Sequence, residues 1–216
     1  MDLELARAQM ISQQLRTWDV FDERVLAVMA DVRRERFLGD AYRGLAFADT
    51  SIPIGGGEIM LPPKLQGRIL QAVAPGPDDA VLEIGTGTGF LTACLGRLGG
   101  RVHSLEIRED LAATAAERLG EETGLDLELT RADGLTAPFG RRYDVIVVTG
   151  ALPVYDDRFE AALNPGGRLF AVVGPPPVRE AWLVTAGDDG ARNCDVLFET
   201  DIPDLCHARQ PERFAF

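Results

Sequence analysis

The chain has 216 residues, 46% of them hydrophobic, and a formal net charge of −12. This length and hydrophobic fraction suffice for one sizeable core, so we expect residues 1–216 to form a single domain. An acidic chain lacks the positive surface that nucleic acids and anionic membranes attract, and we expect neither as a partner.

The first third of the chain, residues 1–74, is predicted to be helical around one long loop. Apolar residues recur at helical spacing over residues 2–16, and residues 22–29 form a second predicted helix capped by Asp22. Residues 40–62 are predicted to be a structureless loop, and a loop of that length inside a domain usually has a function. A third helix is predicted from Pro63 to about residue 74.

After a PGPDD break at residues 75–79, predicted strands alternate with predicted helices. Such alternation favours a parallel sheet with helices on both faces and right-handed connections. The predicted strands cover residues 80–84, 101–106, 125–133, 143–150 and 167–174. The predicted helices cover residues 90–98 and 108–124, and a third begins at residue 156 and is ended by Asn164, Pro165 and the glycines at 166–167.

The C-terminal part breaks this alternation. Residues 175–180 are too few to make a parallel crossover to the next apolar run at 181–186. That run and residues 191–200 read as an antiparallel hairpin around residues 187–190. The fold class is therefore predicted to be α/β: a doubly wound, mostly parallel, seven-stranded Rossmann-like sheet with antiparallel C-terminal strands. In the tail, residues 201–216, Phe214 and Phe216 are candidates for docking on the sheet edge or on another subunit.

The sequence VLEIGTGTGF at residues 81–90 places three glycines where the first strand of the sheet meets a helix. Ligands of open α/β sheets bind beyond the carboxyl ends of the strands. One glycine would satisfy a tight turn, so three at alternate positions indicate a ligand that approaches the backbone closely. A dinucleotide fingerprint would need a glycine at Phe90, and no Gly-Lys-Ser/Thr follows to make a phosphate loop.

Acidic residues around this loop indicate which ligand it binds. Glu83, two residues before the first glycine, suits a ligand with positive charge, such as S-adenosylmethionine, while the loop amides suit its carboxylate. Glu106 ends the second strand, where an acid binds ribose hydroxyls, and Asp133 with Gly134 suits an adenine. The predicted cofactor-binding residues are Glu83, Gly85, Thr86, Gly87, Thr88, Gly89, Glu106, Ile107, Asp133 and Gly134.

The cysteines and histidines do not predict a metal site. Cys94, Cys194 and Cys206 are widely spaced, no CxxC pattern occurs, and His103 and His207 are the only histidines. We expect reduced thiols in a cytoplasmic protein, since neither a secretory signal nor an apolar run of transmembrane length is present.

Together, VLEIGTGTGF, Glu106, ADG at 132–134, YDVIVVTG and NPGGRL resemble the class I S-adenosylmethionine-dependent methyltransferases. Residues 10–38 and the segment AFADTSIPIGGGE at 46–58 resemble the protein-L-isoaspartate O-methyltransferase family more specifically. The resemblance implies a protein-repair enzyme with an altered C-terminal strand order. It implies that the enzyme methylates isoaspartyl residues of peptides or proteins and releases S-adenosylhomocysteine.

The loop 52–64, which would cover the donor and shape the acceptor pocket, departs from the family pattern. The family continues after I-G-x-G with Gln/Val-Thr-Ile-Ser-x-Pro, whereas this chain reads GEIMLPP from Gly57 to Pro63 and has Ile59 and Leu61 at the threonine and serine positions. Neither side chain can form a hydrogen bond, so we assign no catalytic residue. The predicted substrate-loop residues are Ile54, Gly55, Gly57, Ile59, Met60, Leu61 and Pro62.

Three further hypotheses remain beside isoaspartyl methylation, in which an already ionised carboxylate needs no strong base. The apolar residues at 59–61 allow a methyltransferase with a different acceptor. They also allow a non-catalytic S-adenosylmethionine-binding protein that acts as a sensor or partner subunit. A nicotinamide dehydrogenase is disfavoured by Phe90. The sequence leaves open whether the protein is a monomer or a homodimer.

Overall fold

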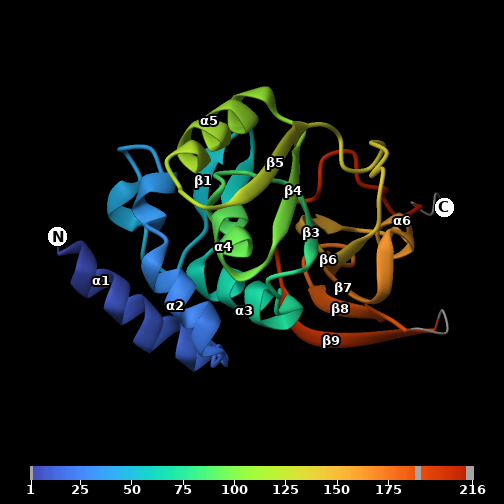
Figure 1. The fold of residues 1–216 in the computed structure, drawn as a ribbon, viewed down its shortest axis with the longest axis horizontal. Helices are drawn as coiled ribbons and strands as arrows, with labels where there is room; N and C mark the ends of the chain where they lie inside the picture. Colours follow the sequence, from blue (N-terminus) through green and yellow to red (C-terminus); the bar gives the residue numbers. More distant parts are fainter. Residues whose placement is uncertain (1, 188–190, 213–216) are drawn as a thin grey trace.

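The computed structural model describes residues 2–187 and 191–212 (Figure 1). Part of the predicted 187–190 turn, as well as Phe214 and Phe216, lies outside these residues. The N-terminal helices are confirmed. Helix α1 (Leu3–Gln9) continues through a π-helical segment (Met10–Leu15) and a 3₁₀ turn (Arg16–Trp18). Helix α2 (Glu23–Asp31) is capped by Asp22, whose Oδ1 accepts a 2.8 Å bond from the Arg24 backbone N–H.

The prediction of a structureless loop at residues 40–62 is wrong. Two short 3₁₀ turns (Arg34–Phe37 and Arg43–Leu45) lead into an antiparallel hairpin of β1 (Ile52–Gly55) and β2 (Glu58–Met60). Its turn uses Gly55, Gly56 and Gly57, which have φ angles of +106°, +61° and +88°. Only glycine adopts such angles readily. Helix α3 (Pro63–Val73) follows and begins at Pro63, as predicted.

The sheet has seven strands in the order β5-β4-β3-β6-β7-β8-β9. Strands β3 to β7 pair in parallel, whereas β7–β8 and β8–β9 pair antiparallel, so the predicted fold class is confirmed. The strands are β3 (Ala80–Ile84), β4 (Arg101–Glu106), β5 (Asp126–Arg131), β6 (Tyr143–Leu152), β7 (Leu163–Val173), β8 (Arg179–Ala186) and β9 (Arg192–Thr200).

Helices cover the two faces of the sheet unequally. Helix α3 and the two helices α4 (Phe90–Leu98) and α5 (Glu109–Gly120) lie on one side, and α6 (Arg158–Ala161) lies on the other (Figure 1). The helix predicted from residue 156 to a stop at Asn164 ends too late, because β7 already begins at Leu163 and pairs with Tyr143 there. Pro165 has no N–H to donate and cannot continue a helix.

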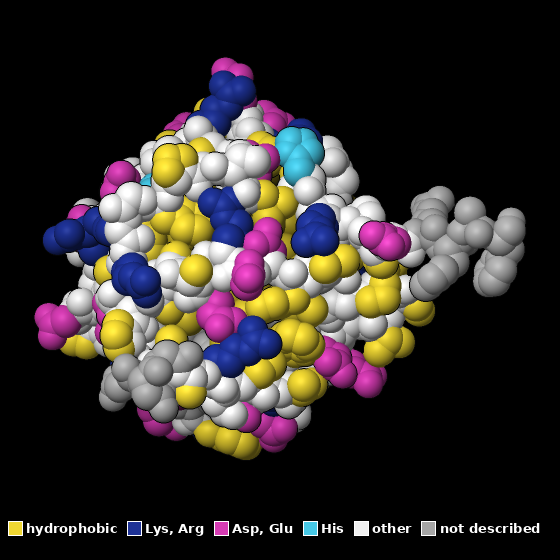
Figure 2. Space-filling view, turned by 90° about the vertical axis from the view of Figure 1, so that its right-hand side faces the viewer, with side chains coloured by type: hydrophobic (Ala, Val, Ile, Leu, Met, Phe, Trp, Pro, Cys, Tyr) yellow, Lys and Arg dark blue, Asp and Glu magenta, His cyan; other side chains and the backbone are white. Residues whose placement is uncertain are grey.

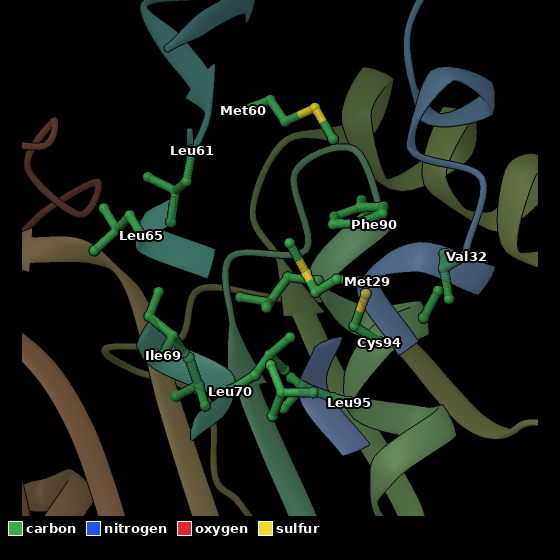
Figure 3. Packing of buried hydrophobic residues seen from close by; sticks show 14 of the residues in the cluster. Met29, Val32, Met60, Leu61, Leu65, Ile69, Leu70, Phe90, Cys94 and Leu95 are labelled. Carbon is green, nitrogen blue, oxygen red and sulfur yellow. The ribbon is translucent and has the colours of Figure 1, made fainter. Parts of the chain in front are cut away.

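The core alternates along each central strand, as a sheet buried on both faces requires. Val81 and Val147 pack under the helices α2 to α5, whereas Leu82 and Ile146 pack on the face that α6 covers. Figure 3 shows the first of these clusters, where α3, α4 and α2 meet below the end of β2. This packing fixes the β1–β2 hairpin and the start of α4 relative to the sheet, and both line the site described next.

Candidate functional site

An open cavity lies at the carboxyl ends of β3, β4 and β6, the place where open α/β sheets bind their ligands. Its walls come from the glycine loop after β3, the end of β4, the β1–β2 hairpin and the tail segment 203–206. The sequence-predicted residues that line it are Ile54, Ile59, Met60, Leu61, Gly85, Thr86, Gly87, Thr88, Glu106 and Ile107.

The three glycines of the loop serve different purposes. Gly85 (φ +94°) leaves room for the Thr149 hydroxyl, which donates 2.9 Å bonds to the Ile84 and Gly85 carbonyls. Gly87 (φ +55°) lines the cavity, and its missing Cβ would meet only Ile54 Cδ1, at 3.5 Å. Gly89 (φ +89°) does not line the cavity. A Cβ there would lie 3.1 Å from Leu119 of α5, so this glycine serves helix packing.

Glu106 reaches the cavity from the end of β4, as predicted. Its Oε2 accepts a 2.8 Å bond from the Gly87 backbone N–H, and its Oε1 accepts a 3.0 Å bond from the Arg108 backbone N–H. These bonds lock the carboxylate beside the glycine loop, and each oxygen retains a lone pair for a ligand hydroxyl.

Glu83 lies behind the loop rather than at the cavity surface. Its side chain is fully buried, and Oε2 accepts bonds of 2.5 and 2.6 Å from the hydroxyls of Thr92 and Ser104. Oε1 is buried without a hydrogen-bond partner in the described part of the chain. Burial raises the pKa of this carboxyl to about 7, against the two hydroxyl bonds, which lower it.

Asp133 and Gly134 do not line the cavity either. Asp133 Oδ1 accepts a 2.9 Å bond from the Leu135 backbone N–H, and Oδ2 lies 2.8 Å from Nδ1 of His207. A Cβ at residue 134 would collide with Ile84 of β3, which explains the glycine by packing. The tail therefore contacts the acid that we expected to bind an adenine.

The tail forms a wall of the cavity that sequence reasoning missed. Residues 203–205 run beside the end of β6, where the Leu205 backbone N–H donates to the Ala151 carbonyl at 2.8 Å. A Cβ at Gly150 would lie 2.7 Å from Leu205 Cα. The buried Arg179 holds this segment through a 2.5 Å ion pair with Asp204. A glycine inside an apolar strand, Gly150, was the available signal, because it permits close backbone approach.

Three consecutive apolar residues of the hairpin and the segment after it face the cavity. Ile59, Met60 and Leu61 all line it, so the two positions without a hydroxyl face the site. Figure 3 shows Met60 and Leu61 leaving the end of β2, with Leu61 next to Leu65 of α3. Of the other predicted loop residues, Ile54 lines the cavity, whereas Gly55, Gly57 and Pro62 do not.

Other kinds of site receive little support from the described residues. No group of three or more His, Cys, Asp or Glu among them could hold a metal ion. Within residues 2–187 and 191–212, no helix is both long and apolar enough to cross a membrane. On the face drawn in Figure 2, basic and acidic side chains are interspersed.

Comparison with known proteins adds independent findings. The family model described as protein-L-isoaspartate(D-aspartate) O-methyltransferase matches residues 6–200. A protein-L-isoaspartate O-methyltransferase of Koribacter versatilis is 37% identical over 185 residues, which are 83% of this chain and 82% of that protein. One from Aeropyrum pernix is 36% identical over 203 residues, covering 89% and 78% of the two chains.

A solved structure supports the fold alone. It is described as a protein-L-isoaspartate O-methyltransferase of Plasmodium falciparum in complex with S-adenosyl-L-homocysteine. It superposes with a TM-score of 0.81 over 92% of this chain and 97% of its own, at 17% sequence identity.

Proposed function

The chain belongs to the protein-L-isoaspartate O-methyltransferase family, and on this premise we propose that its cavity binds S-adenosylmethionine and methylates isoaspartyl residues of peptides and proteins. It is an S-adenosylmethionine-dependent methyltransferase by family. One observation carries the proposal: the glycine loop, Glu106 and the hairpin 52–60 all line the same cavity.

The residues present fit the cofactor. Glu106 has free lone pairs for ribose hydroxyls, and Gly87 leaves open space where any other residue would place a Cβ. The unpartnered Oε1 of Glu83 lies behind the loop, where it can act on a ligand ammonium group through a bridging water. When bound, S-adenosylmethionine supplies a methyl group activated by a sulfonium.

Methyl transfer to an ionised carboxylate requires little acid–base catalysis from the protein. The bound donor would supply its methyl group to an oxygen of the acceptor carboxylate, and the electron pair of the broken carbon–sulfur bond would remain on sulfur. No proton is transferred, so a general base is unnecessary. What the chain contributes is orientation and exclusion of water, which can supply much of a rate enhancement. The apolar wall of Ile59, Met60 and Leu61 suits the exclusion of water.

The same wall supports a second candidate, a methyltransferase of this fold with another acceptor. Leu61 is buried and lines the cavity at the position where the family has serine. A more apolar acceptor would suit such a wall. A test must therefore separate binding of the donor from transfer to the acceptor.

The experiment measures transfer of labelled methyl from S-adenosylmethionine to an isoaspartyl peptide and to the matched aspartyl peptide. We expect transfer to the isoaspartyl peptide only. Binding of S-adenosylhomocysteine is measured on the same preparation. Binding without transfer to either peptide would overturn the proposed acceptor while leaving the cofactor site in place.

The wider setting follows from the same proposal. We place the protein in the cytoplasm, because Cys94, Cys194 and Cys206 are free thiols that suit a reducing compartment. We treat residues 1–216 as one domain, because both the N-terminal hairpin and the tail supply walls of the cavity.

A further inference from the structure

A buried cation lies directly behind the acceptor side of the cavity. The Arg34 side chain is 0% exposed, and its guanidinium donates to the carbonyls of Ala46 at 2.6 Å and Leu61 at 2.7 Å. It also donates to Oε1 of Gln66 and stacks 4.9 Å from the centroid of the Phe90 ring. Burial lowers the pKa of Arg34 to about 9, which leaves it charged at neutral pH.

This cation has no counter-ion in the described part of the chain. None of the ion pairs found among residues 2–187 and 191–212 includes Arg34, and its three partners are neutral. An unpaired charge that is fully buried is costly. Because these partners are neutral, the positive potential of Arg34 is not cancelled by a neighbouring acid among the described residues.

Gln66 connects Arg34 to the cavity. It is 3% exposed, sits on α3 and lines the cavity. A guanidinium can only donate, so Arg34 fixes the amide with its oxygen toward the cation. The amide nitrogen, with two N–H donors, is left on the other side. No described residue accepts a hydrogen bond from this nitrogen. It is also not one of the fully buried side-chain atoms that lack a hydrogen-bond partner.

The cavity offers an anionic acceptor little else. Glu58 and Glu106 line it without an ion-pair partner among the described residues, and the hydroxyls expected at residues 59 and 61 are missing. We infer that the Gln66 side-chain amide binds the acceptor carboxylate, with Arg34 behind it as a positioning residue, in place of those two hydroxyls. This inference rests on the proposed function, since it names the residue that holds that acceptor.

Two physical effects favour this role. A cation bonded to the amide oxygen polarises the amide, so its N–H groups donate more strongly to a carboxylate. The amide is also near the place of the missing hydroxyls, because Arg34 bonds both Gln66 and the backbone carbonyl of Leu61. The amide thus lies close to the residue that replaces the family serine.

The test uses Gln66→Glu in the full-length protein. The new carboxylate can still accept from Arg34, so the fold is maintained, but it has no N–H donor and repels the acceptor. We expect the KM for the isoaspartyl peptide to rise about 10- to 100-fold, the value of a hydrogen bond to a charged group. The dissociation constant of S-adenosylhomocysteine should stay unchanged.

Three further variants make the result specific. Gln71→Glu is the matched control, because Gln71 is also on α3 but bonds the backbone of residues 19, 21 and 22 outside the cavity. Gln66→Met removes the donor without adding a charge, and the same rise in KM would exclude repulsion as the sole cause. Leu61→Ser in the Gln66→Glu background restores a hydroxyl at the family position and should recover part of the lost affinity.

Each possible result supports or overturns the inference about Gln66. An unchanged KM in both Gln66 variants would overturn the inference and leave the proposed function intact. A parallel loss of S-adenosylhomocysteine binding would overturn it too, because the role would then be structural. A wild-type protein that binds S-adenosylhomocysteine but methylates no isoaspartyl peptide would overturn the proposed function, and this inference with it.

Discussion

Replacing Glu83 with glutamine should stabilise the ligand-free protein at alkaline pH. The Glu83 carboxyl is fully buried, and burial raises its pKa from the usual 4.5 to about 7. A carboxyl whose pKa is raised on folding contributes stability that is complete below the unfolded pKa and is lost as pH rises through the folded pKa. Glutamine is a neutral mimic of the protonated acid, so it does not lose that contribution.

The magnitude follows from these two pKa values. Between pH 5 and pH 8, ionisation of Glu83 should cost the folded wild-type protein about 2.5 kcal/mol, at 1.36 kcal/mol for each pKa unit. The constant cost of burying an amide in place of a carboxyl group is the same at both pH values and cancels in the comparison. The expected signature is thus a change with pH in the difference between the two proteins.

The assay is urea unfolding of wild type and Glu83→Gln at pH 5 and pH 8, followed by circular dichroism without cofactor. The variant should gain about 2.5 kcal/mol over wild type between the two pH values. Glu128→Gln, on β5 with a side chain 58% exposed, is the control and should show no such change. A difference between Glu83→Gln and wild type that stays constant with pH would refute the reasoning.

Three other predictions concern the site. Glu83 must ionise to attract a ligand ammonium group. Calorimetry on the wild-type protein should therefore find S-adenosylhomocysteine bound about tenfold more weakly at pH 6 than at pH 8. The Glu83→Gln variant should bind it equally at both pH values. Arg179→Met releases Asp204 and the tail, so it should cost about 1–3 kcal/mol in urea unfolding and weaken cofactor binding; a tail that stays resistant to proteolysis would contradict this. Gly89→Ala should destabilise the fold by about 1–3 kcal/mol through its φ of +89° and contact with Leu119, without changing cofactor affinity.

The sheet was predictable because its strands are continuous apolar runs separated by strong breaks. The six residues 175–180 before the predicted strand at 181–186 excluded a helical crossover, and the antiparallel edge followed from that length alone. The end of α6 was placed too late, because the strand pairing that starts at Leu163 is a tertiary contact that local periodicity does not report. The hairpin at 52–60 was missed for a related reason, since its strands are very short.

Parts of the site were less accessible to sequence reasoning. The motif located the glycine loop and Glu106, but it could not show that Gly89 faces α5 or that Glu83 sits behind the loop. The tail wall depends on Arg179, which pairs with residues more than twenty positions further along the chain. Gln66 gave no signal of its own, because its orientation is fixed by the buried Arg34.

The proposed function depends most on the glycine loop being the cofactor site, and binding of S-adenosylhomocysteine to two glycine variants tests this directly. Gly87→Val places a branched side chain at the cavity, while Gly124→Val imposes a comparable backbone strain at φ +76° where no atom lies within 4 Å. We predict that Gly87→Val loses measurable binding in calorimetry and Gly124→Val keeps the wild-type affinity. Wild-type affinity in a folded Gly87→Val protein would contradict the account.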